Sequence, residues 1–192
     1  CCFFSGGQLI FPKNNRNDFD YFFNEILSIP AETIYLTPSI FNSLSIFAEI
    51  NWLDTQFKLK TIIVAGEELI LTEEINKFIT DYNIRVLNQY GPSETHVVSS
   101  FAITRNKVDE AGRVSIGFPI TNCSFALLDI NKNSLITTPY SIGELLISGA
   151  NLFQGYLKYK DLTDSKFKLI NFDGIESKYY RTGDLCSFDK NG

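Results

Sequence analysis

The sequence contains no methionine and only one histidine, one tryptophan and four cysteines among its 192 residues. With His96 as the single histidine, a histidine-rich metal site is excluded, and a Ser-His-Asp triad could use no other base. The cysteines match no zinc spacing, and we expect reduced thiols at Cys1, Cys2, Cys123 and Cys186. The absence of methionine and the first residue, Cys1, predict an internal part of a longer protein.

Long apolar runs and targeting signals are also missing. No run approaches the roughly 18 apolar residues that a membrane helix needs, and no basic leader with a small-residue cleavage site occurs. The net charge of -5 argues against nucleic-acid binding through a positive field. We therefore expect a cytoplasmic protein with neither membrane nor nucleic acid as a partner.

The first half of the chain alternates between short apolar runs and segments of helical spacing. Strands are predicted at residues 7–11, 33–39, 60–68 and 84–90. Helices are predicted at 18–29, after Pro38, and from Thr72. This alternation is typical of a parallel sheet covered on both faces, and ligands bind at the edge where the carboxyl ends of its strands meet.

The second half has a different pattern. Helical spacing fades after about residue 105, and β-like segments follow at 124–130, 143–149 and 179–185, separated by Gly, Asn, Asp and Pro. The predicted fold class is α/β: a parallel-sheet layer over residues 1–110, followed by a β-rich, barrel-like subdomain over residues 111–192.

The stretch NQYGPSETHVV, residues 88–98, places a polar cluster at the end of a predicted buried strand. The carboxylate of Glu94 suits a Mg²⁺ ion beside a phosphate, Ser93 and Thr95 offer hydroxyl donors to phosphate oxygens, and Tyr90 offers a flat face for a base. The alternative is that Gly91-Pro92 forms an ordinary turn and that Glu94 is solvated. His96 fits a structural role better than that of a catalytic base.

The stretch YRTGDL, residues 180–185, contains a Thr-Gly-Asp turn in which Asp184 could accept hydrogen bonds from a ribose diol. A third stretch, GELLISGANLFQGYL at 143–157, has a strand and loop punctuated by glycine, which favours a structural role. The GxGxxG and GxxxxGK[ST] fingerprints are absent. The residues alone indicate an α/β nucleotide or phosphate site with a β-rich flanking lobe.

Taken together and in order, NQYGPSE, GELLISGANLFQGYL and YRTGDL resemble the core motifs of adenylate-forming enzymes, and most closely the adenylation domains of nonribosomal peptide synthetases. The segments IIVAGEEL and IGFPI are also similar to that family. The resemblance implies activation of an amino-acid carboxylate with ATP and Mg²⁺, giving an aminoacyl-adenylate and pyrophosphate. Transfer would follow to the phosphopantetheine thiol of a carrier domain, with a condensation domain as a further partner.

The resemblance also implies roles for particular residues. Ser93 would contact the α-phosphate, and Glu94 would hold Mg²⁺. The other implied nucleotide contacts come from Asn88, Tyr90, Gly91, Asp184 and the backbone around Gly66 and Glu67. The implied walls of the amino-acid pocket are Tyr35, Ile63, Ala65, Gln89, Val97 and Val98. None of these pocket residues is charged, which favours a neutral, apolar substrate side chain.

The sequence departs from the family pattern at Gln154, where the family usually has arginine. The family's upstream phosphate loop and its downstream lobe with the catalytic lysine do not occur in these residues, so we expect the chain alone to be inactive. Two alternatives remain open. One is an acyl- or aryl-acid CoA ligase of the same superfamily, although the Gly-Pro pair favours amino acids. The other is a degenerate nucleotide-binding or docking module without turnover.

Overall fold

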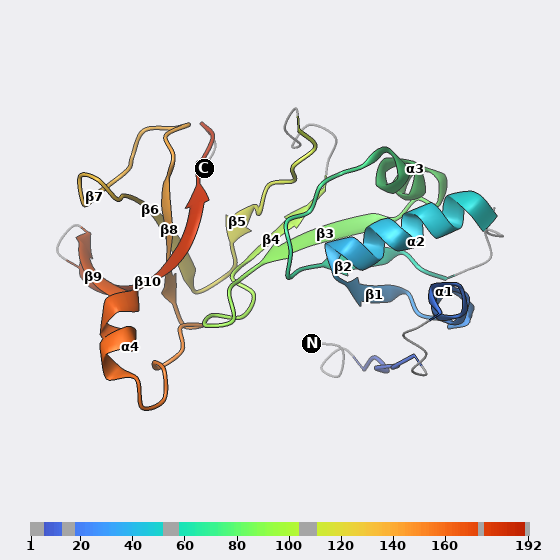
Figure 1. The fold of residues 1–192 in the computed structure, drawn as a ribbon, viewed down its shortest axis with the longest axis horizontal. Helices are drawn as coiled ribbons and strands as arrows, with labels where there is room; N and C mark the ends of the chain where they lie inside the picture. The colour runs from blue at the N-terminus through green and yellow to red at the C-terminus, as the bar shows by residue number, and fades with distance from the viewer. Residues whose placement is uncertain (1–5, 13–17, 52–57, 104–110, 173–174, 191–192) are drawn as a thin grey trace. The chain divides into compact units, whose positions relative to one another are not determined.

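The computed structural model describes residues 6–12, 18–51, 58–103, 111–172 and 175–190 (Figure 1). The chain divides into two compact units. The first unit comprises Cys1–Asn88 and Ala102–Ser115, and the second comprises Gln89–Phe101 and Ile116–Gly192. None of the described helices has both the length and the apolar character needed to cross a membrane.

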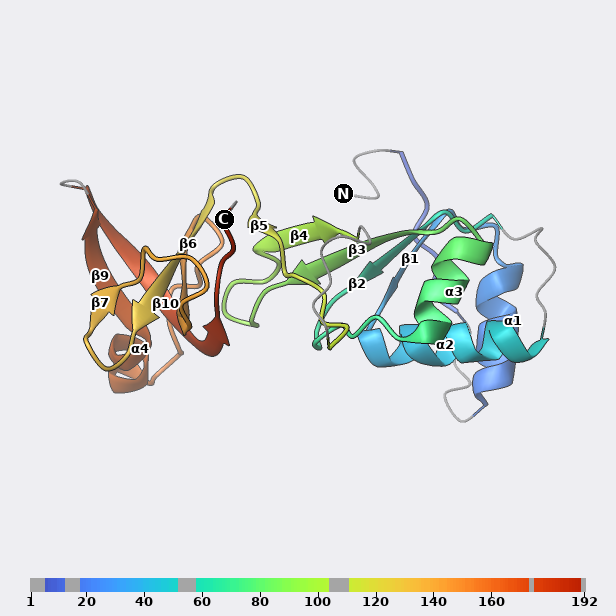
Figure 2. The ribbon, with the colours of Figure 1, turned by 90° about the horizontal axis from the view of Figure 1, so that it is seen from above.

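The first unit is an α/β layer. Its elements are α1 (Phe19–Ser28), β1 (Thr33–Leu36), α2 (Pro38–Asn51), β2 (Thr61–Val64), α3 (Glu73–Asp81) and most of β3 (Arg85–Tyr90). Strand β2 lies between β1 and β3 and is parallel to both. Figures 1 and 2 show the three helices on one side of these strands. The predicted alternation of parallel strands and helices is therefore confirmed.

Local signals in the sequence set the helix starts. Asp18 caps α1 by accepting a hydrogen bond from the backbone of Tyr21, and Thr72 caps α3 in the same way through Ile75. Helix α2 begins at Pro38 itself, since proline lacks only an N–H that the first turn leaves unpaired. Across the interface of α2 and α3, the rings of Phe41 and Phe78 meet edge to face at 6.0 Å.

Two expectations for the first unit are wrong. Residues 7–11 form no strand, and Phe11 remains 79% exposed, because none of the described strands hydrogen-bonds to this run. Within the described residues, the strands are also not covered on both faces. In β2, Ile62 and Val64 are fully buried while their neighbours are half-buried, and Tyr35 of β1 is 59% exposed. The reason is that the three described helices of this unit cover one face of the strands.

The second unit is β-rich. It contains the end of β3, most of β4 (Ser99–Ala102), β5 (Phe118–Pro119), β6 (Cys123–Asp129), β7 (Ser134–Leu135), β8 (Gly143–Gly149), α4 (Lys160–Lys166), β9 (Phe167–Phe172) and β10 (Ile175–Cys186). Five of these strands form an antiparallel sheet in the order β7-β6-β8-β10-β9. Both faces of its central strand β8 are buried, around Leu145 and Ile147 on one side and Leu146 on the other. The predicted fold class, an α/β layer followed by a β-rich lobe, is confirmed.

Two features of the second unit differ from the predictions. The sequence pattern did not predict α4, which is short and buries none of its residues. The Thr-Gly-Asp stretch is not a turn between strands but an irregularity inside the twelve-residue strand β10. The pairing of β10 with β8 shifts register between Arg181 and Leu185, and Gly183 takes a positive φ of 83° there.

Candidate nucleotide site

A compact loop follows β3 and carries the centre of the predicted site. Thr95 is buried, its backbone N–H donates to the carbonyl of Pro92, and its hydroxyl lies 3.0 Å from the carbonyl oxygen of His96. The loop closes where the N–H of Val98 donates to the carbonyl of Tyr90 over 2.8 Å. These hydrogen bonds within the loop fix the course of its backbone, and therefore the positions from which its side chains start.

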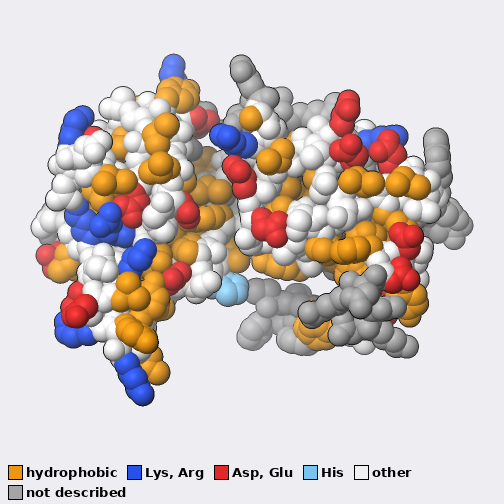
Figure 3. Space-filling model, viewed as in Figure 1, with side chains coloured by type: hydrophobic (Ala, Val, Ile, Leu, Met, Phe, Trp, Pro, Cys, Tyr) orange, Lys and Arg blue, Asp and Glu red, His pale blue; other side chains and the backbone are white. Residues whose placement is uncertain are grey.

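Gly91 and His96 meet across this loop. A Cβ atom at Gly91 would lie 1.7 Å from the carbonyl oxygen of His96, so only glycine fits. His96 has a φ of 56°, and its side chain is exposed, as the pale blue atoms in Figure 3 show. His96 therefore contributes to the shape of the loop through its backbone conformation.

Tyr90 and Asp184, which the sequence separates widely, are in contact. The phenol of Tyr90 donates a hydrogen bond of 2.5 Å to Oδ2 of Asp184. Burial, and then this bond to a carboxylate, raises the pKa of Tyr90 far above its usual value, so the phenol remains a donor. Burial also raises the pKa of the nearby Cys186 thiol to about 11, which keeps that thiol neutral. The arrangement presents an exposed carboxylate beside an aromatic ring.

Glu94 is held by two aromatic residues that the sequence analysis did not single out. The phenol of Tyr156 donates to Oε1 of Glu94 over 2.7 Å, and the hydroxyl of Tyr180 lies 3.5 Å from that of Tyr156. Partial burial acts to raise the pKa of Glu94. The hydrogen bonds from Tyr156, from its own backbone and from Tyr180 outweigh that effect, and the pKa is lowered. Glu94 is therefore an ionised carboxylate at neutral pH.

Glu144, on the neighbouring strand β8, fixes the irregular part of β10. Its carboxylate is buried, with the side chain only 5% exposed, and it accepts two hydrogen bonds from Arg181 and one of 3.1 Å from the backbone N–H of Gly183. The hydroxyl of Thr182 donates to the carbonyl of Leu145. This network sets the course of the backbone into Asp184.

The remaining predicted residues of the second unit lie in the same loop or directly next to it. Ser93 is exposed, Gln89 and Val97 are half-buried, and the carbonyl of Val97 accepts a hydrogen bond from the amide of Asn151. Val98 is completely buried and packs in the core of the second unit. The structure thus gathers the loop residues and Asp184 within one unit.

The other predicted residues belong to the first unit. Tyr35 and Ile63 lie side by side on β1 and β2. Asn88 is buried, and its amide nitrogen donates a hydrogen bond to the carbonyl of Ser115. The Glu67 carboxylate accepts hydrogen bonds from Ser39 at the start of α2.

Two further predicted residues, Ala65 and Gly66, follow directly after β2. Ala65 is buried and donates its N–H to the carbonyl of Leu36, and Gly66 has a φ of 99°. That conformation favours glycine because a side chain would be strained there. These residues connect the strand to the segment that carries Glu67.

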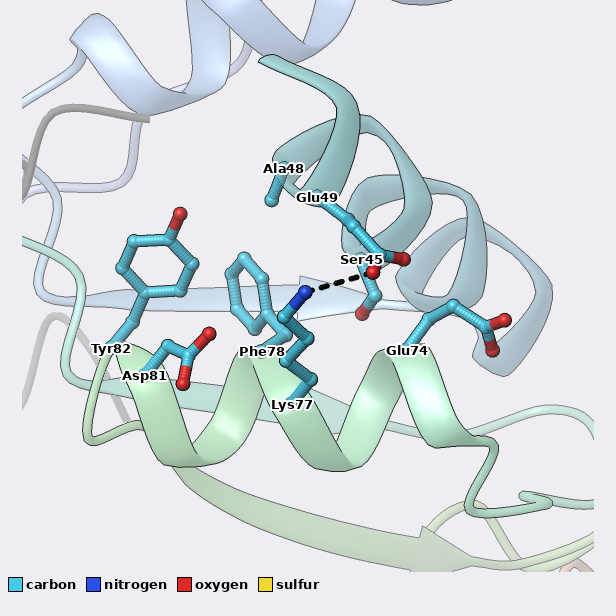
Figure 4. Close-up of a pocket in the computed structure, with 8 residues that line it drawn as sticks. All are labelled: Ser45, Ala48, Glu49, Glu74, Lys77, Phe78, Asp81 and Tyr82. Atoms are coloured by element: carbon cyan, nitrogen blue, oxygen red, sulfur yellow. Dashed lines mark hydrogen bonds and ion pairs between the residues drawn. The ribbon is translucent and has the colours of Figure 1, made fainter. Parts of the chain in front are cut away.

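A separate hollow lies between α2 and α3 in the first unit and contains none of the predicted site residues (Figure 4). It is lined by Ser45, Ala48, Glu49, Glu74, Lys77, Phe78, Asp81 and Tyr82. An ion pair of 2.8 Å between Lys77 and Glu49 crosses it. Both side chains are largely exposed, so this pair contributes little to stability.

A metal ion would fit at Glu94 only with ligands from a phosphate. Within the described part of the chain, no cluster of three or more His, Cys, Asp or Glu side chains could enclose an ion. Mg²⁺ is commonly bound by one or two carboxylates together with phosphate oxygens and water. A single, ionised and hydrogen-bonded carboxylate matches that pattern.

The structure is an α/β layer with a β-rich unit in which two carboxylates, Asp184 and Glu94, accept hydrogen bonds from tyrosine hydroxyls. The family model described as AMP-binding enzyme matches residues 1–157. The chain therefore belongs to the AMP-binding enzymes, and the prediction of an enzyme of the adenylate-forming superfamily is confirmed.

The relatives show where in the family the similarity lies. Gramicidin S synthase 2 of Brevibacillus brevis is 36% identical over 197 residues, which cover 98% of this chain and 4% of the synthase. A D-alanine–D-alanyl carrier protein ligase of Streptococcus equi subsp. equi (strain 4047) is 30% identical over 95% of this chain and 35% of the ligase. The chain thus spans only a small part, at most about a third, of these relatives. The predicted resemblance to adenylation domains of peptide synthetases is confirmed.

Solved structures agree with this assignment. PA1221, described as an NRPS protein containing adenylation and PCP domains, superposes with a TM-score of 0.76 at 25% identity. The match covers 90% of this chain and 34% of PA1221.

Proposed function

We propose that the protein carrying this chain activates an amino acid with ATP. An amino-acid carboxylate attacks the α-phosphate, which gives an aminoacyl-adenylate and releases pyrophosphate. The phosphopantetheine thiol of a carrier domain then attacks the acyl carbon, which forms a thioester and releases AMP. A condensation domain would be a further partner. The observation that carries the proposal is that one unit holds both the hydrogen-bonded pair of Tyr90 with Asp184 and, in the loop after Tyr90, the hydrogen-bonded carboxylate of Glu94.

The residues of the loop and of β10 support a division of roles. The ring of Tyr90 would stack on adenine while its hydroxyl orients Asp184, whose exposed carboxylate would accept hydrogen bonds from the ribose diol. Ser93 would donate to the α-phosphate from an exposed position. Gly91 permits the tight approach of the loop to itself, which fixes these side chains relative to one another. Such fixed positions are what an in-line displacement at phosphorus requires.

Glu94 would hold Mg²⁺ together with the phosphate oxygens. The bound ion would neutralise the negative charge that builds up as pyrophosphate leaves. The role of Glu94 is to fix the ion against the phosphates, and Tyr156 keeps the carboxylate oriented for it.

The predicted contacts in the first unit belong to the same proposal. Asn88 and the backbone of Gly66 and Glu67 would contact adenine. The amino-acid pocket would be formed by Tyr35, Ile63, Ala65, Gln89, Val97 and Val98. None of these side chains is charged, so we expect a neutral and largely apolar substrate side chain.

A second candidate activity has an observation in its favour. The 30% identity to a D-alanine–D-alanyl carrier protein ligase extends over 95% of the chain. The alternative proposal is therefore activation of D-alanine for transfer to a D-alanyl carrier protein. Both candidates share the adenylation step and the same use of Glu94 and Asp184.

The test is amino-acid-dependent ATP–pyrophosphate exchange by the complete adenylation domain that contains this chain. A panel of L-amino acids, D-alanine and simple carboxylic acids is compared for wild type and Glu94→Gln. We expect exchange with one neutral amino acid and a loss of at least about a hundredfold in Glu94→Gln. Glu176→Gln, which changes an exposed carboxylate of β10, is the matched control and should leave exchange unchanged.

The possible results separate the candidates. Exchange with D-alanine alone would select the second candidate, and exchange only with non-amino acids would refute both. A well-folded domain that exchanges with nothing would show that the motifs survive without turnover. We expect the 192-residue chain alone to be inactive, because it spans about a third of the length of the carrier protein ligases.

A further inference from the structure

We propose that Tyr156 and Tyr180 are positioning residues for Glu94: they hold its carboxylate in the orientation that binds the cation. The proposal rests on the proposed function, since it assumes that Glu94 is the cation ligand. It assigns a role to two residues of the sequence motifs, Tyr156 and Tyr180, for which the resemblance implied none.

The contacts fix Glu94 by both its side chain and its backbone. The phenol of Tyr156 donates to Oε1 over 2.7 Å, and the N–H of Phe153 donates to the carbonyl oxygen of Glu94 over 3.0 Å. The hydroxyl of Tyr180 lies 3.5 Å from that of Tyr156. A carboxylate has about four acceptor positions, so it can accept a phenol and bind a cation at once.

The two phenols are themselves held by an aromatic cluster. The ring of Phe153 meets Tyr156 at 4.9 Å and Tyr180 at 5.8 Å, both edge to face, and Phe167 lies 5.8 Å from Tyr180. Tyr180 is only 3% exposed. Because the packing restricts rotation of these rings, the hydroxyl groups of Tyr156 and Tyr180 keep their positions next to Glu94.

Helix α4 fixes the backbone of Tyr156. The hydroxyl of Thr163 accepts a hydrogen bond of 2.9 Å from the N–H of Tyr156 and donates to the carbonyl of Tyr159. Gly155, just before Tyr156, has a φ of 143°, and a Cβ atom there would lie 2.6 Å from Cγ2 of Thr163. Helix α4 therefore helps to position Tyr156, which in turn holds Glu94. This is a structural role for a helix that buries none of its own residues.

Hydrogen-bond partners of metal-ligating groups typically contribute about 10–100-fold to metal affinity. The experiment measures the dissociation constant of Mn²⁺, by electron paramagnetic resonance, on the complete adenylation domain saturated with α,β-methylene-ATP. We expect Tyr156→Phe to weaken Mn²⁺ binding about tenfold and Tyr180→Phe severalfold. Tyr159→Phe, which removes an exposed phenol three residues away, is the matched control and should stay within about twofold.

Exchange kinetics provide a second measurement. For Tyr156→Phe we expect the Mg²⁺ concentration for half-maximal exchange to rise about tenfold, while the rate at saturating Mg²⁺ stays close to wild type. A loss of rate that no Mg²⁺ concentration restores would contradict a positioning role through the cation.

A double variant separates this proposal from a general loss of structure. In the Glu94→Gln background, Tyr156→Phe should cause no further loss of Mn²⁺ affinity, because the carboxylate that it orients is gone. If Glu94→Gln weakens Mn²⁺ binding but Tyr156→Phe and Tyr180→Phe do not, the positioning proposal is refuted and the proposed function stands. If Glu94→Gln itself leaves Mn²⁺ binding unchanged, the metal role in the proposed function is refuted. Because phenylalanine occupies nearly the volume of tyrosine, the variants should fold, and Tyr180→Phe provides the same test if Tyr156→Phe does not.

Discussion

Gly91 and His96 set the course of the backbone in the loop after β3. Gly91 leaves no space for a methyl group against the carbonyl of His96, and His96 itself turns the chain with a positive φ. The hydroxyl of Thr95, predicted as a phosphate donor, hydrogen-bonds within the loop instead. The side chains of Ser93 and His96 are exposed, and the Glu94 carboxylate accepts a hydrogen bond from Tyr156. The motif therefore combines residues that shape the loop with residues that are available for a ligand.

At this scale we predict the effect of Gly91→Ala. The added methyl group would have to displace the backbone of His96, so the free energy of unfolding should fall by at least about 2 kcal/mol. Urea denaturation followed by circular dichroism measures the change. Ser93→Ala, at an exposed position of the same loop, should change it by less than about 0.5 kcal/mol. Equal stabilities for the two variants would show that the loop relaxes freely around residue 91.

At the scale of elements, β10 combines two tasks. Its first part pairs regularly with β9, whereas its second part leaves the register of β8 between Arg181 and Leu185. The irregular part is the one that carries Asp184 toward Tyr90. The buried carboxylate of Glu144 on β8 compensates for the interrupted ladder, because it accepts the N–H of Gly183 that a regular strand would pair with a carbonyl.

We predict that Glu144→Ala destabilises this element specifically. It leaves Arg181 and the N–H of Gly183 without their buried acceptor, which should cost about 2–3 kcal/mol of unfolding free energy. Hydrogen exchange at Gly183 should accelerate more than exchange at Tyr179, which lies in the regular part of β10. Glu176→Ala, at an exposed position of the same strand, should change neither quantity. Uniform acceleration along β10 would contradict a local role of Glu144.

At the scale of the whole molecule, the site should link nucleotide binding to stability. A ligand that binds only the folded state at a hundred times its dissociation constant stabilises that state by about 2.7 kcal/mol. We predict that ATP with Mg²⁺ raises the Tm of the complete adenylation domain by several degrees, and that removing Mg²⁺ with EDTA removes much of this rise.

The same measurement on variants assigns the effect of the cation. In Glu94→Gln, the Tm with ATP should no longer depend on Mg²⁺, whereas in Tyr159→Phe it should respond as in wild type. If Glu94→Gln keeps the full Mg²⁺-dependent rise, the cation is bound without this carboxylate.

The sequence by itself determined the features that depend on neighbouring residues. The alternation of apolar runs and helical spacing predicted β1, β2 and β3 with their helices, and α3 starts directly after Thr72, as predicted. The ordered motifs identified the family. Residues 7–11 show the limit of such patterns, because an apolar run becomes a strand only when another strand pairs with it.

Only the tertiary structure decided which side chains meet. Tyr156 reaches Glu94 from 62 residues away, and Glu144 reaches Gly183 across the pairing of β8 with β10. Such contacts depend on strand register and on one bulge, and a shift by a single residue would turn every side chain to the other face. The periodicity of a strand does not specify its register against a distant partner. The loop and its carboxylate could therefore be predicted from the sequence, whereas the residues that hold them are brought there by the folded sheet.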